Sequence, residues 1–264
     1  MKSSDLVSAS LWVSSQAGGS LFLASSAWMV SGLTPSPLIN SLIPVIAAIP
    51  ILIDIKERLG AYWLQAGSIF VLLVASWFYG DEGISRGVLL SISFAAIFSY
   101  YLGIEASSIP LQKKLMSNTD VRLKTIQICT ELGSLLGAAM TALIFPAVSQ
   151  FVPALILVLP LLIIVYRRKV HYPEINDSQV SNVSNDINLK FNKFPFLQGF
   201  VLGGLFAVLA LWVRVIDGGK CFDFGIILAS YFLGKALVSI LPKIKLSLSY
   251  ILVVCLLIAF QLIQ

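Results

Sequence analysis

Three ionisable residues lie inside stretches of this sequence that are otherwise dominated by apolar residues. They are Glu105, Glu131 and Lys235. A carboxylate in an apolar environment can carry a proton, and an acid and a base there can neutralise each other as an ion pair. The chemistry that these residue types suggest is therefore proton or ion handling within an apolar region. The elements that would position them are long apolar helices.

A short charged loop, from Asp54 to Gly60, separates two long apolar runs. In a bilayer, so short a loop makes its two flanking helices antiparallel neighbours, because every backbone polar group in lipid must be satisfied within a helix. The loop contains the bases Lys56 and Arg58, which mark the side of the membrane that the loop faces.

The composition indicates a polytopic membrane protein. Hydrophobic residues make up 58% of the chain, charged residues 12%, and the mean hydropathy is +0.91. Soluble domains are less apolar than this. The formal net charge is +5, but the bases are spread over separate loops rather than along one solvated face. We therefore expect a lipid bilayer as the partner and no nucleic acid.

A spanning helix needs roughly 20 apolar residues to cross about 30 Å of hydrocarbon. This length predicts nine spans, with approximate limits of 8 to 30, 36 to 53, 61 to 80, 87 to 109, 124 to 147, 151 to 167, 195 to 215, 224 to 242 and 247 to 263. Fourteen Lys and Arg residues then fall on one side and three on the other, with Lys235 inside a span. Basic loops stay cytoplasmic, so we expect an internal amino terminus and an external carboxyl terminus in a plasma or inner membrane.

The longest polar stretch, residues 171–193, is rich in Asn, Ser and Asp and is typical of a flexible cytoplasmic linker. It divides an N-terminal six-helix bundle, residues 1–170, from a partial three-helix bundle, residues 194–264. The fold class expected is all-α.

No pattern in the sequence indicates an enzyme or a cofactor. The cysteines Cys129, Cys221 and Cys255 are odd in number and lack metal-ligand spacing, so neither a disulfide framework nor a metal site is expected. No phosphate-cradling loop or nucleophile triad is visible either.

Six spans, a cytoplasmic linker and further spans form a layout that resembles the major facilitator superfamily, in particular its multidrug and siderophore exporters. The local sequences that carry the resemblance are the Pro-containing segment at 31–37, the loop residues Asp54 and Arg58, and the segments at 122–125 and 131–138. The loop match is partial, because Pro50 and Glu57 stand where the superfamily usually has Gly.

The resemblance implies two helix bundles that rock about a site near the membrane midplane. The superfamily has six helices in each half, whereas this chain supplies six and three, so helices ten to twelve are missing. Either the reading frame is truncated at Gln264, or a nine-span form is complete and uses a partner chain. A genomic reading frame that continues beyond Gln264 with three further apolar runs would indicate truncation.

The resemblance also implies roles for the charged residues. Asp54, with Lys56 and Arg58, would act as a cytoplasmic gate latch, or the loop would serve as an orientation signal alone. Helices five and eight face each other across the two halves in the resembled fold, and Glu131 and Lys235 lie at matching depth on them. We therefore predict an ion pair that breaks and re-forms during rocking. In the alternative, Lys235 extends to the interface and Glu131 faces a wet cavity alone.

Glu105, near the end of the fourth span, is either a proton-coupling carboxylate or an interfacial acid beside Lys113 and Lys114. The drug antiporters would have Arg at the position of Ser99, and this difference argues against proton antiport.

The remaining candidates are expected to be structural. The pairs Gly133 with Gly137 and Gly199 with Gly203 are spaced four apart and predict close helix packing. Four tryptophans near predicted span ends are expected to be interfacial anchors, namely Trp28, Trp63, Trp77 and Trp212. Four charged residues between spans seven and eight are expected to form a solvated cluster, namely Arg214, Asp217, Lys220 and Asp223.

The sequence thus favours a secondary transporter that moves a small amphipathic solute, with export preferred over uptake. The alternative is a non-transporting membrane subunit or a degenerate transporter fragment.

Overall fold

The computed structural model describes residues 3–52, 61–79, 85–108, 123–144, 150–167, 208–215 and 218–240, and every regular element in these segments is helical. The elements are α1 (Ser3–Leu33), α2 (Pro37–Ala48), the 3₁₀ turn η1 (Ile49–Leu52), α3 (Tyr62–Trp77), α4 (Arg86–Gly103), the π-helical turn η3 (Ile104–Ser108), α6 (Leu123–Leu143), α7 (Phe151–Arg167) and α10 (Cys221–Ile240). A further short helix covers residues 208–215. The all-α class predicted from the sequence is confirmed for this part of the chain.

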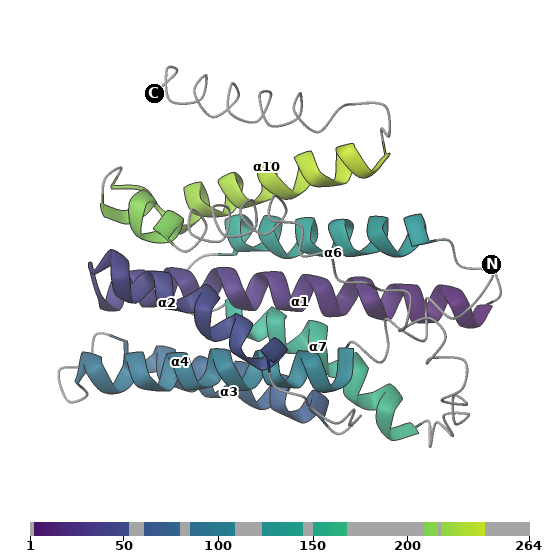
Figure 1. Cartoon of the computed structure of the whole chain (residues 1–264), viewed down its shortest axis with the longest axis horizontal. Coiled ribbons are helices and arrows are strands. Elements are labelled where there is room, and N and C mark those ends of the chain that lie inside the picture. Colours follow the sequence, from purple (N-terminus) through teal and green to yellow (C-terminus); the bar gives the residue numbers. More distant parts are fainter. Residues whose placement is uncertain are drawn as a thin grey trace.

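Helix α1 is the central element of the bundle. It packs against α6 on one side and against α7 and α4 on the other, and α10 covers the far side of α6 (Figure 1). Helix α3 packs against α4 and α7. At 1.5 Å per residue, the 31 residues of α1 extend about 46 Å, so this helix can contact neighbours along its whole length.

Serine and proline residues define where several helices begin and end. The Ser36 hydroxyl accepts a hydrogen bond from the backbone N–H of Ile39 at the start of α2, and Pro37 follows in the first turn. Helix α2 ends at Ala48 and continues as η1, which contains Pro50. Pro50 has no backbone N–H to donate to the preceding turn, so one hydrogen bond of the α-helical ladder is missing there; α2 tolerates the same loss at Pro44.

Polar side chains on α1 bond across to its neighbours. The Ser14 hydroxyl donates to the carbonyl oxygen of Leu157 on α7 at 2.6 Å. The Ser20 hydroxyl donates to the carbonyl oxygen of Ser134 on α6 at 3.0 Å. In the core beside them, the ring of Phe22 stacks on Tyr100 of α4, with centroids 4.1 Å apart. These contacts hold α1 to three different helices.

One described stretch, Arg86–Ser107, is long and apolar enough to cross a membrane, whereas Pro37–Ala48 and Tyr62–Trp77 are apolar but shorter. The sequence predicted longer spans at 36–53 and 61–80. In the first, α-helix gives way to the 3₁₀ turn around Pro50, which shortens the regular helix to 12 residues. In the second, α3 has 16 residues and ends at Trp77.

Candidate functional site: a charge pair between helices α6 and α10

The acidic and basic residues singled out on α6 and α10 lie against each other. The Lys235 Nζ atom is 3.3 Å from Oε1 of Glu131, within ion-pair distance. The Glu131 side chain is 10% exposed and that of Lys235 is 47% exposed. The sequence predicted this pairing from matching depth and from the facing of the two helices in the resembled fold. A buried carboxylate is thus paired with a cation whose stem reaches toward the surface of the bundle.

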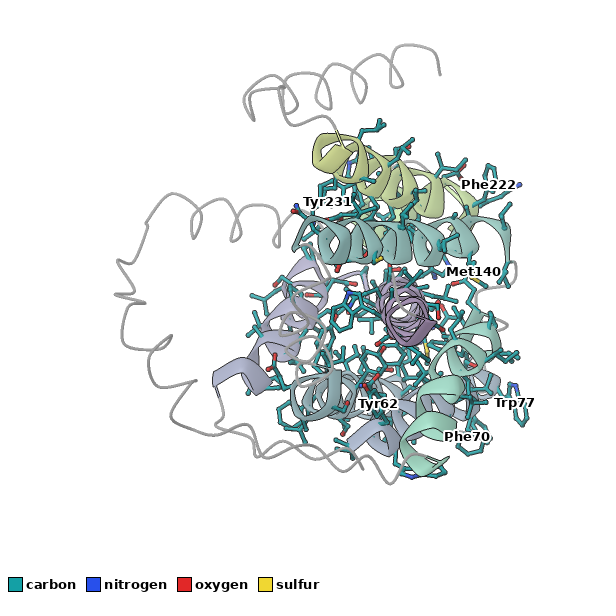
Figure 2. All side chains as sticks on the ribbon, turned by 90° about the vertical axis from the view of Figure 1, so that its right-hand side faces the viewer. Tyr62, Phe70, Trp77, Met140, Phe222 and Tyr231 are labelled. Carbon is teal, nitrogen blue, oxygen red and sulfur yellow. The ribbon has the colours of Figure 1, made fainter. Side chains whose placement is uncertain are left out.

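An aromatic ring on α10 adds to the surroundings of the pair. The Lys235 Nζ lies 5.9 Å from the ring centroid of Tyr231, one turn earlier on the same helix. Figure 2 shows Tyr231 on α10 beside α6. The negative face of an aromatic ring attracts an ammonium group at about this distance. Lys235 therefore has an electrostatic partner on its own helix as well as on α6.

Two contacts fix the register of α6 and α10. Glu131 meets Lys235 near one end, and Gly225 lies against Ala142 near the other. A Cβ atom added to Gly225 would lie 2.8 Å from the Cβ of Ala142, so the two backbones are in close contact there. Since the sequence rises along α6 while it falls along α10, the helices are antiparallel. The two contacts are about 15 Å apart along the axes.

The position of Glu131 is also set by the contact between α6 and α1. The indole N–H of Trp12 donates to the Thr130 hydroxyl at 2.8 Å, next to Glu131 in the chain. A Cβ atom added to Gly133 would lie 2.6 Å from the Cβ of Gln16, and one added to Gly137 would lie 2.8 Å from the Cβ of Ser20. This is the close packing that the spacing of Gly133 and Gly137 predicts.

Glu105 lies in the π-helical turn η3 and is partly buried. The turn is held to α3 through Ser107, whose hydroxyl accepts from Nε2 of Gln65 at 2.9 Å and whose carbonyl accepts from the Tyr62 hydroxyl at 3.3 Å. No hydrogen bond or ion pair joins Glu105 to another residue within the described segments. The structure therefore places Glu105 in a turn that is held to α3, and the role of this carboxylate stays a prediction.

Several predicted site residues lie outside the described residues. They are the loop residues Asp54, Lys56 and Arg58, the glycines Gly199 and Gly203, and the linker at 171–193. Their roles stay predictions.

Gln150 is a buried residue for which the sequence analysis predicted no role. Its Oε1 accepts a hydrogen bond from the Ser25 hydroxyl at 2.7 Å, and its Nε2 donates to the carbonyl oxygens of Thr141 and Ile144, both at 2.8 Å. The Sγ of Cys221 lies 3.1 Å from the same nitrogen. Gln150 thereby joins α1, the end of α6 and the first residue of α10. No sequence pattern distinguishes it from an ordinary loop glutamine.

The four tryptophans predicted to be interfacial anchors differ in exposure, and Trp212 is partly buried against the core. Trp63 and Trp77 are 69% and 72% exposed, as the prediction of interfacial anchors requires. Trp28 is 8% exposed and stacks on Phe224 of α10, with ring centroids 5.7 Å apart. The prediction that Trp28 is an interfacial anchor is therefore wrong, because its ring fills a contact between two helices.

The prediction of a solvated charge cluster is wrong for Arg214, which contacts α1, whereas the hydrogen bond of Asp223 is exposed. The Arg214 guanidinium donates to the carbonyl oxygen of Trp28 at 2.9 Å. The Asp223 carboxylate accepts from the backbone N–H of Lys220 at 2.6 Å, an N-terminal cap of α10. Both side chains are used in contacts between or within helices. Asp217 lies outside the described residues.

Neither a protein-family model, nor a curated protein, nor a solved structure matches this chain.

Proposed function

We propose that this chain is an integral membrane protein of the secondary-transporter class, which moves a small solute by alternating access. The described part of the chain is all-α, and the proposal adds a polytopic membrane arrangement and a transport function. The observation that carries it is the Glu131–Lys235 ion pair between two largely apolar helices. Charged residues in such helices are costly, and they are found where ions, protons or substrates are handled.

The position of the pair supports a role in motion between helices. Helix α10 contacts the described bundle chiefly through α6. A charge pair at this contact adds a directional attraction that can be lost and regained when the two helices move, whereas apolar packing supplies no such discrete interaction. The predicted role, an ion pair that opens and closes between two bundles, requires a contact of this kind.

The outward face of α3 supports burial of the chain in lipid. Trp63 and Trp77 are both largely exposed and stand 14 residues apart, about 21 Å along the helix. Phe70 is exposed between them, and Figure 2 shows Phe70 and Trp77 on the same outer side of the bundle. Two tryptophans that flank an exposed apolar surface are typical of a segment between two membrane interfaces.

The membrane part of the proposal is tested by fluorescence quenching with brominated lipids. Variants that keep either Trp63 or Trp77 as the only tryptophan are reconstituted into vesicles with bromine at different acyl depths. We expect both residues to be quenched best by shallow bromines. Quenching of neither residue at any depth would contradict the placement of α3 in lipid.

The transport part is tested in the same vesicles, loaded with a fluorescent amphipathic dye. Protein-dependent dye movement under a proton or sodium gradient is expected for the natural chain, with a slower rate for Lys235→Met. The matched control is Lys220→Gln, which removes one exposed positive charge from a loop. Equal rates in vesicles with and without protein, across a series of amphiphiles and gradients, would contradict the transport proposal.

A second candidate, a non-transporting membrane subunit, is favoured by the tight helix contacts. Gly133 and Gly137 meet α1, and Gly225 meets Ala142, so closely that an added Cβ would collide at each position. Such contacts resist sliding and suit a rigid scaffold. Dye movement that requires the predicted partner chain would favour this candidate, whereas movement by the isolated chain would exclude it.

A further inference from the structure

Arg214, in the helix at 208–215, contacts the ends of two helices from the first part of the chain. Its Nη2 donates to the carbonyl oxygen of Trp28 on α1 at 2.9 Å, and its Nη1 donates to the hydroxyl of Tyr79, just after α3, at 3.2 Å. Its Cζ lies 4.3 Å from the centroid of the Trp28 ring. One guanidinium thus makes hydrogen bonds in its plane and a cation–π contact with its face.

The missing side chain of Gly32 makes room for this arrangement. A Cβ atom added to Gly32 would lie 2.9 Å from Cζ of Arg214 and would also collide with Nη1 and with the Tyr79 hydroxyl. The guanidinium and the phenol therefore meet directly above the backbone of α1. Any larger residue at position 32 would displace one of them.

The contact also includes α10. The Trp28 ring contacts both the Arg214 guanidinium and the ring of Phe224, which is in the first turn of α10. The turn between the two helices is closed by a hydrogen bond from the Gly219 N–H to the carbonyl oxygen of Val213 at 2.9 Å. Arg214 and Phe224, which lie on either side of this turn in the sequence, therefore both contact the Trp28 ring.

This contact is far from the Glu131–Lys235 pair. Trp12 lies beside Thr130, at the level of Glu131, and Trp28 is 16 residues further along α1. That separation is about 24 Å along the helix. The two contacts also differ in kind, because Arg214 contacts a carbonyl, a phenol and an indole, all of them neutral groups.

We propose that Arg214 is a cationic latch, meaning a contact that holds two parts of the bundle together and releases reversibly. It fastens the 208–215 helix and the start of α10 to the ends of α1 and α3. This contact lies at the other end of the bundle from the Glu131–Lys235 pair. Release during a transport cycle rests on the proposed function, but the latch itself does not. Release of the guanidinium leaves no partner carboxylate buried and unpaired, so it should cost less than opening of the Glu131–Lys235 pair.

A double-mutant cycle tests the latch by thermal unfolding of the purified full chain in detergent. Arg214→Gln should lower the Tm by about 2 to 4 °C. Tyr79→Phe should lower it in the natural chain and have no effect in the Arg214→Gln background. Lys220→Gln, which removes the same charge six residues away from an exposed position, should have no effect. If Arg214→Gln does not accumulate, Arg214→Lys takes its place, because it keeps the charge and loses the planar contacts.

Additive effects of the Arg214 and Tyr79 substitutions, or an equal loss from Lys220→Gln, would overturn the latch.

Release is tested with the natural thiol of Cys221, which is buried at the first residue of α10. In a chain carrying Cys129→Ala and Cys255→Ala, a soluble maleimide can label Cys221 only when this end of the bundle opens. We expect Arg214→Gln to raise the labelling rate about three- to tenfold and Lys220→Gln to leave it unchanged. This readout does not require transport, so it separates failure of the latch from failure of the proposed function. Unchanged labelling in Arg214→Gln would show a fixed contact and overturn release.

Discussion

Removing the cation of the Glu131–Lys235 pair should destabilise the protein more than removing the anion. The two side chains differ in burial, since Glu131 is 10% exposed and Lys235 is 47% exposed. Lys235→Met leaves a buried carboxylate without this partner. Glu131→Gln leaves an ammonium group that can reach the surface on its flexible stem. The asymmetry follows from the geometry and does not depend on what the protein transports.

The magnitude follows from the 3.3 Å separation. At an effective dielectric constant of about 20, the direct attraction is about 5 kcal/mol. The half-exposed position of Lys235 and the cost of removing both charges from solvent reduce the net contribution well below this value. We expect Lys235→Met to cost about 1 to 3 kcal/mol and Glu131→Gln to cost about 1 kcal/mol or less.

The assay is thermal unfolding of the two single variants and the double variant in detergent. Each kcal/mol corresponds to roughly 2 to 4 °C in Tm for a chain of this size class. The double variant should be more stable than Lys235→Met alone, because it no longer contains the buried, unpaired carboxylate. A larger loss from Glu131→Gln than from Lys235→Met, or strict additivity in the double variant, would refute this account of the pair.

Three further outcomes are expected. Gly137→Ala should lower the Tm because its new methyl group would collide with Ser20, whereas Gly67→Ala, which has nothing within 4 Å, should raise the Tm slightly by adding up to about 1 kcal/mol of stability; equal shifts would argue against the α1–α6 contact. Asp223→Ala should cost about 1 kcal/mol by removing the N-terminal cap of α10, and an unchanged Tm would exclude that cap. Asp54→Asn should slow dye movement in vesicles without altering membrane insertion; an unchanged rate would leave the loop with an orientation role alone.

Helix positions were predictable from the sequence because apolar runs and helix-ending residues are local signals. The predicted run at 8 to 30 corresponds to α1, that at 87 to 109 to α4 with its π-helical turn, and that at 124 to 147 to α6. The lengths were less predictable, as in α2, where the proline-containing continuation is a 3₁₀ turn rather than α-helix. Hydropathy does not register the backbone donors that proline removes.

The interpretation of charged and aromatic residues depended on partners far away in the chain. Arg214 and Trp28 both lie near the ends of apolar runs, and position alone predicted a solvated cation and an interfacial ring. Their mutual contact spans 186 positions, which no local pattern encodes. Gln150 is a similar case, since its partners Ser25 and Cys221 come from helices distant in sequence.

By itself, the sequence determined that the described segments form apolar helices and predicted matching depths for Glu131 and Lys235, because hydropathy and helical rise are properties of each segment alone. Only the tertiary structure decided that these two residues meet at 3.3 Å, and that Arg214 engages Trp28 at the other end of the bundle. The physical reason is that a side chain's partner is fixed by which helix faces pack together. Glycine contacts, such as the contact of Gly137 in α6 with the backbone of α1, determine which faces pack together. Their effect appears only when two backbones approach each other.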